Sequence, residues 1–111
     1  MRQKHAMEHT ELVVLHLLSR EDMYGYQMIV ELERRSDKTF SMKEGTLYPL
    51  LHAMEKNKLV KSYTKETPEG RQRKYYTLTE DGRDQLERKK QEWKLFSEKV
   101  NAVIGATPCT V

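Results

Sequence analysis

A chain of 111 residues is large enough for one domain with a single modest hydrophobic core. Hydrophobic residues make up 37% of it and charged residues 33%, and no apolar run reaches the length of a membrane span, so the sequence excludes a membrane-embedded protein. The single cysteine, Cys109, excludes an internal disulfide, and the polar start lacks the apolar stretch of a secretion signal, so we expect a cytoplasmic protein.

The net charge of +3 is unevenly distributed along the chain. Residues 56–76 contain seven Lys and Arg against two Asp and Glu, which gives a net charge of +5. The net charge of residues 1–55 is −2, and that of residues 77–111 is zero because their positive and negative side chains are equal in number. Clustered positive charge predicts a polyanionic partner that is bound through its phosphates. The alternative is a solvated surface, and charge alone does not decide between the two.

Two helices are predicted in the first third of the chain. Residues 10–19 are apolar nearly all round, which predicts a short buried helix with Thr10 as its cap. His16 within it has no second histidine at metal-ligand spacing, so we interpret it as a partly buried histidine with satisfied hydrogen bonds. Residues 20–23 form a polar break before the second helix.

The second helix is expected from about Tyr24. Its core-facing residues follow a helical period and are Gly25, Met28, Ile29 and Leu32. Because Gly25 has no side chain, a neighbouring helix could pack closely there. The hydroxyls of Tyr24 and Tyr26 either reach phosphates at the helix N-terminus or belong to packed aromatic rings.

Residues 41–56 predict the helix around which the chain is organised. Its apolar face carries Leu47, Leu50, Leu51 and Met54. The opposite face begins with the small or polar residues Lys43, Glu44, Gly45 and Thr46, continues with Pro49, and has Tyr48 on its flank. A slim polar N-terminal face fits the major groove of DNA, and the alternative is an ordinary surface helix.

Two starts are possible for this helix. Ser41 and Glu44 match a capping box, which would place Pro49 inside the helix. A start near Gly45 or Thr46 would place Pro49 in the first turn, where it costs little, and we favour this later start.

After Asn57 the period changes from helical to alternating, which predicts two strands within residues 59–78, joined by a Pro- and Gly-containing turn at residues 66–70. Arg71, Arg73 and Lys74 lie at or near the tip of this hairpin. A basic hairpin after a recognition-type helix is a wing, for which we favour phosphate contact over simple loop solvation.

A long helix is expected from a cap at Thr79 to about Ile104. Leu86, Trp93 and Val100 repeat every seven residues, and Phe96 and Val103 form a second such series, interrupted at Lys89. This stripe exceeds what one small core can cover and predicts a second copy of the chain as its partner. Residues 105–111 are expected to be a loose tail, in which Cys109 is incidental.

Several motifs, in this order, resemble the PadR-like transcriptional regulators, specifically the short members with one C-terminal helix. They are Gly25-Tyr26 with Ile29 and Leu32, Gly45-Thr46-Leu47-Tyr48-Pro49 with Leu51 and Glu55, Leu59-Val60, Lys74-Tyr75-Tyr76-Thr77-Leu78-Thr79, and Gly82. The resemblance covers roughly residues 12–93 and implies an α+β, mainly α, winged helix-turn-helix. Its DNA-binding region would be residues 1–78, with a recognition helix at about 44–57 and a wing at about 59–78, and residues 79–104 would form a dimerisation helix.

The resemblance also implies a homodimer that binds near-palindromic double-stranded operator DNA, usually as a repressor. The expected DNA-binding residues are Tyr26, Lys43, Gly45, Thr46, Tyr48, Pro49, Arg71, Arg73 and Lys74. The expected dimer residues are Leu12, Leu15, Leu86, Trp93, Phe96, Val100 and Val103. In some members an aromatic residue like Trp93 lines a cavity for a flat aromatic effector, although a Trp packed in the dimer seam is the favoured interpretation.

The other function classes are a winged-helix module that binds protein instead of DNA, and an enzyme. A protein-binding wing would not need the +5 segment. The four histidines are scattered and no nucleophile, metal-ligand or phosphate-loop motif is present, so we expect no enzyme, no cofactor, no metal and no membrane partner.

Overall fold

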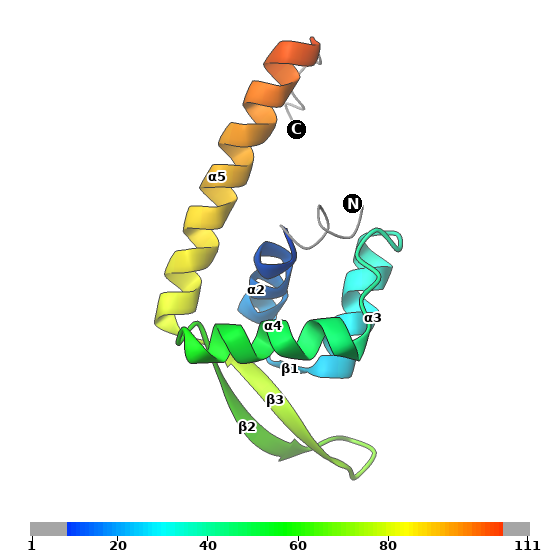
Figure 1. Ribbon diagram of the computed structural model, residues 1–111. Coiled ribbons are helices and arrows are strands. Elements are labelled where there is room, and N and C mark those ends of the chain that lie inside the picture. Colours follow the sequence, from blue (N-terminus) through cyan, green and yellow to red (C-terminus); the bar gives the residue numbers. More distant parts are fainter. Residues whose placement is uncertain (1–8, 106–111) are drawn as a thin grey trace.

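The computed structural model describes residues 9–105 (Figure 1). The elements in chain order are α2 (Thr10–Arg20), β1 (Met23–Tyr24), α3 (Gly25–Arg35), α4 (Glu44–Lys56), β2 (Val60–Glu66), β3 (Gln72–Leu78) and α5 (Glu80–Ile104). In the figure α2, α3 and α4 lie together in the middle of the molecule, the β2–β3 hairpin extends below α4, and α5 extends away above it. None of the helices in this described part is both long and apolar enough to span a bilayer.

The sheet has three antiparallel strands in the order β1-β3-β2. β2 and β3 form the predicted hairpin, with Val60 opposite Leu78 and Glu66 opposite Gln72. The short strand β1 was not predicted, because the sequence at residues 20–23 was interpreted only as a polar break. It pairs with the other edge of β3, where Met23 lies opposite Tyr76 and Tyr24 opposite Tyr75.

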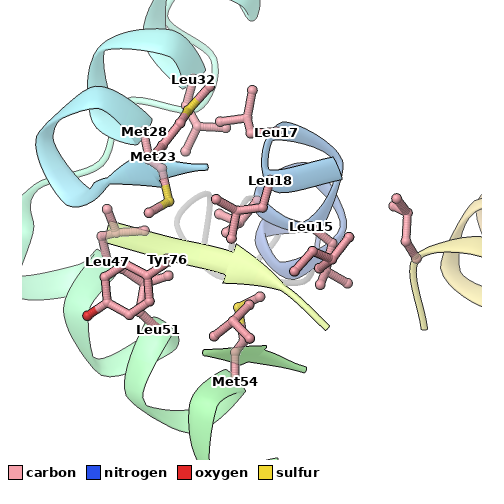
Figure 2. Close-up of a cluster of buried hydrophobic side chains, with 14 residues drawn as sticks. Leu15, Leu17, Leu18, Met23, Met28, Leu32, Leu47, Leu51, Met54 and Tyr76 are labelled. Atoms are coloured by element: carbon pink, nitrogen blue, oxygen red, sulfur yellow. The ribbon is translucent and has the colours of Figure 1, made fainter. Parts of the chain in front are cut away.

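The core lies between the three short helices and the inner face of the sheet (Figure 2). The apolar faces predicted for α3 and α4 are buried there, except that Ile29 and Leu50 are only partly buried. The fully buried side chains, each less than 2% exposed, are Val14, Leu15, Met23, Met28, Leu47, Leu51, Met54, Val60 and Tyr76. The helical period therefore identified the core faces of α3 and α4, and the structure adds that the Tyr76 and Leu78 face of β3 packs on the core.

Leu15 and Leu86 were expected at a dimer interface, but the structure contradicts this for both. Leu15 is 0% exposed and Leu86 is 3% exposed within one chain, because α5 begins against α2. These two side chains have no surface left for a second copy.

The starts of two helices also differ from expectation. His9 stands at the N-cap position of α2 without a side-chain capping hydrogen bond, and Thr10 is the first helical residue instead of the cap. α4 begins at Glu44 after an extended Lys43 and has no side-chain cap, and the hydroxyl of Ser41 donates to Glu33 at 3.0 Å instead of capping α4. Pro49 therefore lies inside α4, beyond the first turn, and removes one backbone hydrogen bond from the helix.

The end of α4, the start of β2 and the start of α5 are joined by backbone hydrogen bonds. Leu59 N–H donates to Met54 O at 2.9 Å and Lys58 N–H donates to Glu55 O at 3.0 Å, which is a Schellman motif with Lys58 in the left-handed region at φ 63°. Thr79 then donates its backbone N–H to Leu59 O at 3.0 Å. The tight turn after α4 thus supplies the carbonyl that anchors α5.

Thr79 caps α5 as predicted, since its side-chain oxygen accepts the backbone N–H of Gly82 at 2.9 Å. The same hydroxyl donates to Lys58 O at 2.7 Å. A side chain at Gly82 would overlap the carbonyl of Leu59 and would lie 2.6 Å from Leu78 Cδ1. Gly82 is therefore what allows α5 to approach the α4–β2 turn so closely.

Beyond this junction α5 leaves the rest of the chain. Its 25 residues span about 38 Å, yet only Gly82 and Leu86 are buried. Trp93, Phe96, Val100, Val103 and Ile104 are exposed on the part that extends away (Figure 1).

Replacement of Gly82 by alanine is expected to destabilise the fold, although alanine normally favours a helix. The overlap with Leu59 O should lower the free energy of unfolding by about 2 kcal/mol, or the unfolding temperature by roughly 10 °C. Thermal unfolding followed by circular dichroism measures this. Gly45→Ala is the control, because nothing lies within 4 Å of the added atom, and equal unfolding temperatures for the two variants would contradict the close approach.

Candidate nucleic-acid interface

The N-terminal half of α4 presents an open, slim surface. Lys43, Gly45, Thr46 and Pro49 are all exposed, and the side chains of Leu47 and Leu51 point the other way into the core (Figure 2). Glu44 is also exposed, so this surface carries one charge of each sign. The exposed set can accept or donate hydrogen bonds to another molecule without moving the core.

Gly45 has no structural reason to be glycine. A Cβ added there would meet nothing within 4 Å, and alanine has a higher helix propensity than glycine. The bare backbone at this position therefore favours a role outside the fold, such as close approach of a partner.

Tyr48, which was expected on the flank of the helix and among the DNA-binding residues, is turned partly toward α3. It is half-buried, and its ring covers Gly25 at the start of α3, where an added Cβ would lie 2.7 Å from Cζ of the ring. This is the close helix approach expected at Gly25. The ring holds α4 against α3, so only part of Tyr48 is available to a ligand.

The start of α3 adds a second exposed group. Tyr26 is 58% exposed in the first turn. The side chain of Gln27 turns back to accept the backbone N–H of Tyr24 at 3.1 Å, which organises the helix N-terminus. Such a terminus carries a partial positive charge that favours an anion.

The basic side chains of the β2–β3 hairpin, the wing, lie on both of its faces. The guanidinium carbon of Arg73 lies 5.6 Å from the ring centre of Tyr24, directly before α3. Lys74 points to the opposite face, where its Nζ lies 4.0 Å from Glu55 of α4 and 5.6 Å from the ring centre of Tyr76. Arg71 is exposed just before β3.

Tyr24 and Gly25 are thus the point at which three elements meet. α4 reaches it through Tyr48, β3 reaches it through Arg73, and α3 begins there. Of the nine predicted contact residues, the structure leaves eight exposed and turns Tyr48 toward α3.

Lys65 was counted in the +5 segment but was not singled out as a contact residue, and the structure places it opposite Arg73 in the hairpin. Only the strand register places the two side by side, and that register depends on the turn. Within residues 9–105, neither Lys65 nor Arg73 nor Arg71 forms an ion pair with a carboxylate. No three metal-ligating side chains gather in this part of the chain.

The exposed stripe of α5 forms a second candidate region. Trp93 is 46% exposed, with the ring of His9 at 5.1 Å and that of Phe96 at 6.2 Å between ring centres. A hollow of about 190 Å³ lies beside it, lined by His9, Leu12, Lys89, Glu92, Trp93 and Phe96. Of the seven expected dimer residues, Leu12 is half-buried, and Trp93, Phe96, Val100 and Val103 are exposed.

A larger hollow of about 290 Å³ lies between α2 and the end of α3. Its lining is mostly apolar and includes Leu12, Val13, His16, Leu17, Glu31, Leu32, Arg35, Ser36, Phe40 and Lys90. Burial, followed by the charges of Lys90, Arg20 and Arg35, lowers the pKa of His16. The imidazole is therefore uncharged at neutral pH and does not add a cation to this apolar surface.

Comparison with known proteins agrees with this geometry. The structure is similar to a crystal structure of a PadR-like transcriptional regulator from Bacillus cereus, at 38% sequence identity and a TM-score of 0.80 over 88% of this chain and 93% of that one. The sequence is 33% identical to the uncharacterized protein X of Lysinibacillus sphaericus over 77% of this chain and 78% of that protein. It is also 31% identical to the transcriptional regulator YqjI of Escherichia coli over 86% of this chain, although it spans only 44% of YqjI's length.

A family model covers most of the folded part of the chain. The model of the PadR-like family of transcriptional regulators matches residues 14–88, from α2 into α5. This match confirms the resemblance inferred from the sequence, and the similar crystal structure confirms a winged helix-turn-helix followed by one long helix. The chain belongs to the PadR-like family of transcriptional regulators.

Proposed function

We propose that the chain binds double-stranded operator DNA with α4 in the major groove and the hairpin on the adjacent backbone. The observation that carries this proposal is the bare surface at Gly45, next to exposed Lys43 and Thr46 at the start of α4. Small residues there let the helix approach base edges, which carry sequence information. Tyr26, Arg71 and Arg73 then contact phosphates, which set the register without reading sequence.

The proposed functional unit is a homodimer. The support for it is the exposed stripe of Phe96, Val100, Val103 and Ile104, because an apolar series along one side of a projecting helix favours burial against a partner. The apolar hollow beside α2, of about 290 Å³, is the surface that we propose for the end of the partner's α5. A two-fold dimer would read a near-palindromic operator whose half-sites lie about 34 Å apart.

The proposed action is repression that a flat aromatic effector relieves. Trp93 lies on the stripe that a second copy would cover, and the hollow of about 190 Å³ beside it is lined partly by aromatic rings. A ligand bound between the two chains would change the spacing of the two recognition helices and so the fit to both half-sites.

Gly45→Ala is expected to separate DNA binding from stability. The variant should unfold at an equal or higher temperature, because alanine has the higher helix propensity and the added methyl meets no neighbouring atom. It should bind its own promoter region at least several-fold more weakly, because the added methyl occupies the surface that approaches the groove. Electrophoretic mobility shift and thermal unfolding measure the two effects, and unchanged affinity would remove Gly45 from the interface.

Thr46→Ala and Arg73→Gln are expected to impair different parts of DNA binding, the first its sequence preference and the second its overall affinity. Thr46→Ala should reduce binding to the promoter region relative to random DNA, because it removes a group that faces the bases. Arg73→Gln should weaken binding to both DNAs alike and reduce the dependence of log K on log salt by about 1.8 for the dimer, since one phosphate contact worth about 0.9 is lost in each half-site. Titration of each variant across salt with both DNAs measures this. Equal weak binding of the parent chain to both DNAs would favour a protein-interaction module instead.

Phe96→Glu is expected to separate the dimer, because it would bury an unpaired carboxylate in the seam. A cost of about 3 kcal/mol would weaken dimerisation roughly 100-fold. Leu95→Glu is the matched control, since both side chains are 58% exposed and Leu95 is turned about 100° around the helix. Light scattering after size exclusion gives the mass, and an equal effect of both variants would contradict the proposed stripe.

A further inference from the structure

The β2–β3 hairpin is joined to the rest of the sheet by few backbone contacts. β3 pairs with β1 at two positions, Met23 with Tyr76 and Tyr24 with Tyr75. β2 is the outermost strand of the sheet, so its backbone pairs only with β3 among the described strands. A two-stranded hairpin is marginally stable by itself. The direction in which the hairpin leaves the body of the chain therefore depends on side chains that link β2 to other elements.

One such link crosses the outer face of the sheet. The Tyr63 hydroxyl of β2 donates to the carboxylate of Asp22, directly before β1, at 2.6 Å. β1 and β2 lie on either side of β3 and are therefore about 9.6 Å apart, so the side chain of Tyr63 spans the width of β3. Its ring lies over that of Tyr75, with ring centres 5.8 Å apart and 18° between the planes. We call the hydrogen-bonded pair of Asp22 and Tyr63 the brace.

The hydrogen bond of the brace joins a neutral donor to a charged acceptor. Such O–H···O⁻ bonds are short and roughly twice as strong as bonds between neutral groups, and the separation of 2.6 Å falls in their range. This bond, followed by burial and the charge of Asp22, raises the pKa of Tyr63 to about 12. The hydroxyl therefore keeps its proton, and remains a donor, throughout the neutral pH range.

A second link lies on the inner face of β2, one residue earlier. Ser62 Oγ donates to Glu55 of α4 at 2.7 Å, and the other carboxylate oxygen of Glu55 lies 4.0 Å from Lys74 Nζ. Successive residues of a strand point to opposite faces. β2 is therefore held by α4 on one face and by the strand that leads into α3 on the other. The starts of α3 and α4 both belong to the proposed DNA-binding surface.

Asp22 is an unfavourable residue for the charge of this face. Lys65 and Arg73 lie on the same face of the hairpin, each over an aromatic ring, and a carboxylate near them reduces the positive potential that attracts a polyanion. Asp22 forms no ion pair with any cation of residues 9–105. Its carboxylate instead accepts the Tyr63 hydroxyl, so its role in the structure is to fix β2.

We infer that Asp22 and Tyr63 are positioning residues for DNA binding, which hold the hairpin at the angle at which it and α4 contact the same DNA. The inference rests on the proposed function and deepens it, because these residues act through the position of the wing. Without the brace the hairpin of the free chain would sample more directions, and ordering it on DNA would reduce the affinity. The phosphate contacts would still form in the complex, because every cation of the wing is retained.

The test compares Asp22→Asn with Asp22→Ala in the full chain. Both variants lose the same negative charge, so any gain in electrostatic attraction to DNA is equal in the two. Asparagine keeps an oxygen that can accept the Tyr63 hydroxyl, whereas alanine has none. Tyr63→Phe removes the donor and keeps the ring. Fluorescence anisotropy across salt, with promoter DNA and with random DNA, measures the affinity, and thermal unfolding shows that each variant retains the fold.

Asp22→Ala is expected to bind both DNAs roughly tenfold more weakly than Asp22→Asn, because one brace is lost in each chain of the dimer. Tyr63→Phe should bind more weakly than the parent chain by a similar factor, with an unchanged slope of log K against log salt, because it removes no cation. Without DNA, the backbone amides of β2 should exchange hydrogen faster in Asp22→Ala and Tyr63→Phe, and at the parent rate in Asp22→Asn.

Two failures are distinguishable. If the parent chain shows no salt-dependent DNA binding, the proposed function is wrong, and with it the role of the brace in that function. If the parent binds DNA but Asp22→Ala and Asp22→Asn have equal affinity, only the inference about the brace is overturned. A lower salt slope in Tyr63→Phe would also overturn it, because phosphate contacts would then be lost in the complex.

Discussion

The carbonyl of Leu59 is the point on which the arrangement of the elements depends. It ends the turn after α4, precedes β2, and accepts the backbone N–H of Thr79 at 3.0 Å. The absence of a side chain at Gly82 lets α5 start directly against it. This carbonyl therefore joins the turn between α4 and β2 to the start of α5, and its hydrogen bond to Thr79 helps to set their relative directions.

Periodicity in the sequence was enough to predict the helices, the hairpin and most of the core. It could not separate burial within one chain from burial between two chains, because both require apolar residues at the same spacing, and so Leu15 and Leu86 were assigned to the wrong partner. β1 is two residues long, too short to show alternation, and exists because β3 offers a free edge. The direction of Tyr48 could not be predicted because it depends on Gly25 in another helix. The position of Lys65 beside Arg73 could not be predicted because it depends on the register of the two strands.

Residues that are locally unfavourable for the stability of their helix or strand occur in α4 and in the hairpin. Gly45 and Pro49 both weaken α4, and Lys65 opposes Arg73 in the sheet. Lys65 and Arg73 each lie over an aromatic ring, but no carboxylate in the described part of the chain neutralises either charge. Natural proteins tolerate such conflicts where function requires them, which is why α4 and the hairpin are the best candidates for the site.

The length of α5 has a consequence for control at a distance. Because α5 is anchored at Leu59 and packs against α2 through Leu86, it keeps its direction relative to its own domain, and with its total length of about 38 Å it acts as a lever. In the proposed dimer, a change of about 5° in the direction of this lever would displace the attached domain by about 3 Å. That displacement is close to one step of roughly 3.4 Å between base pairs. A ligand would need only a slight effect on the seam to move each recognition helix by one base pair.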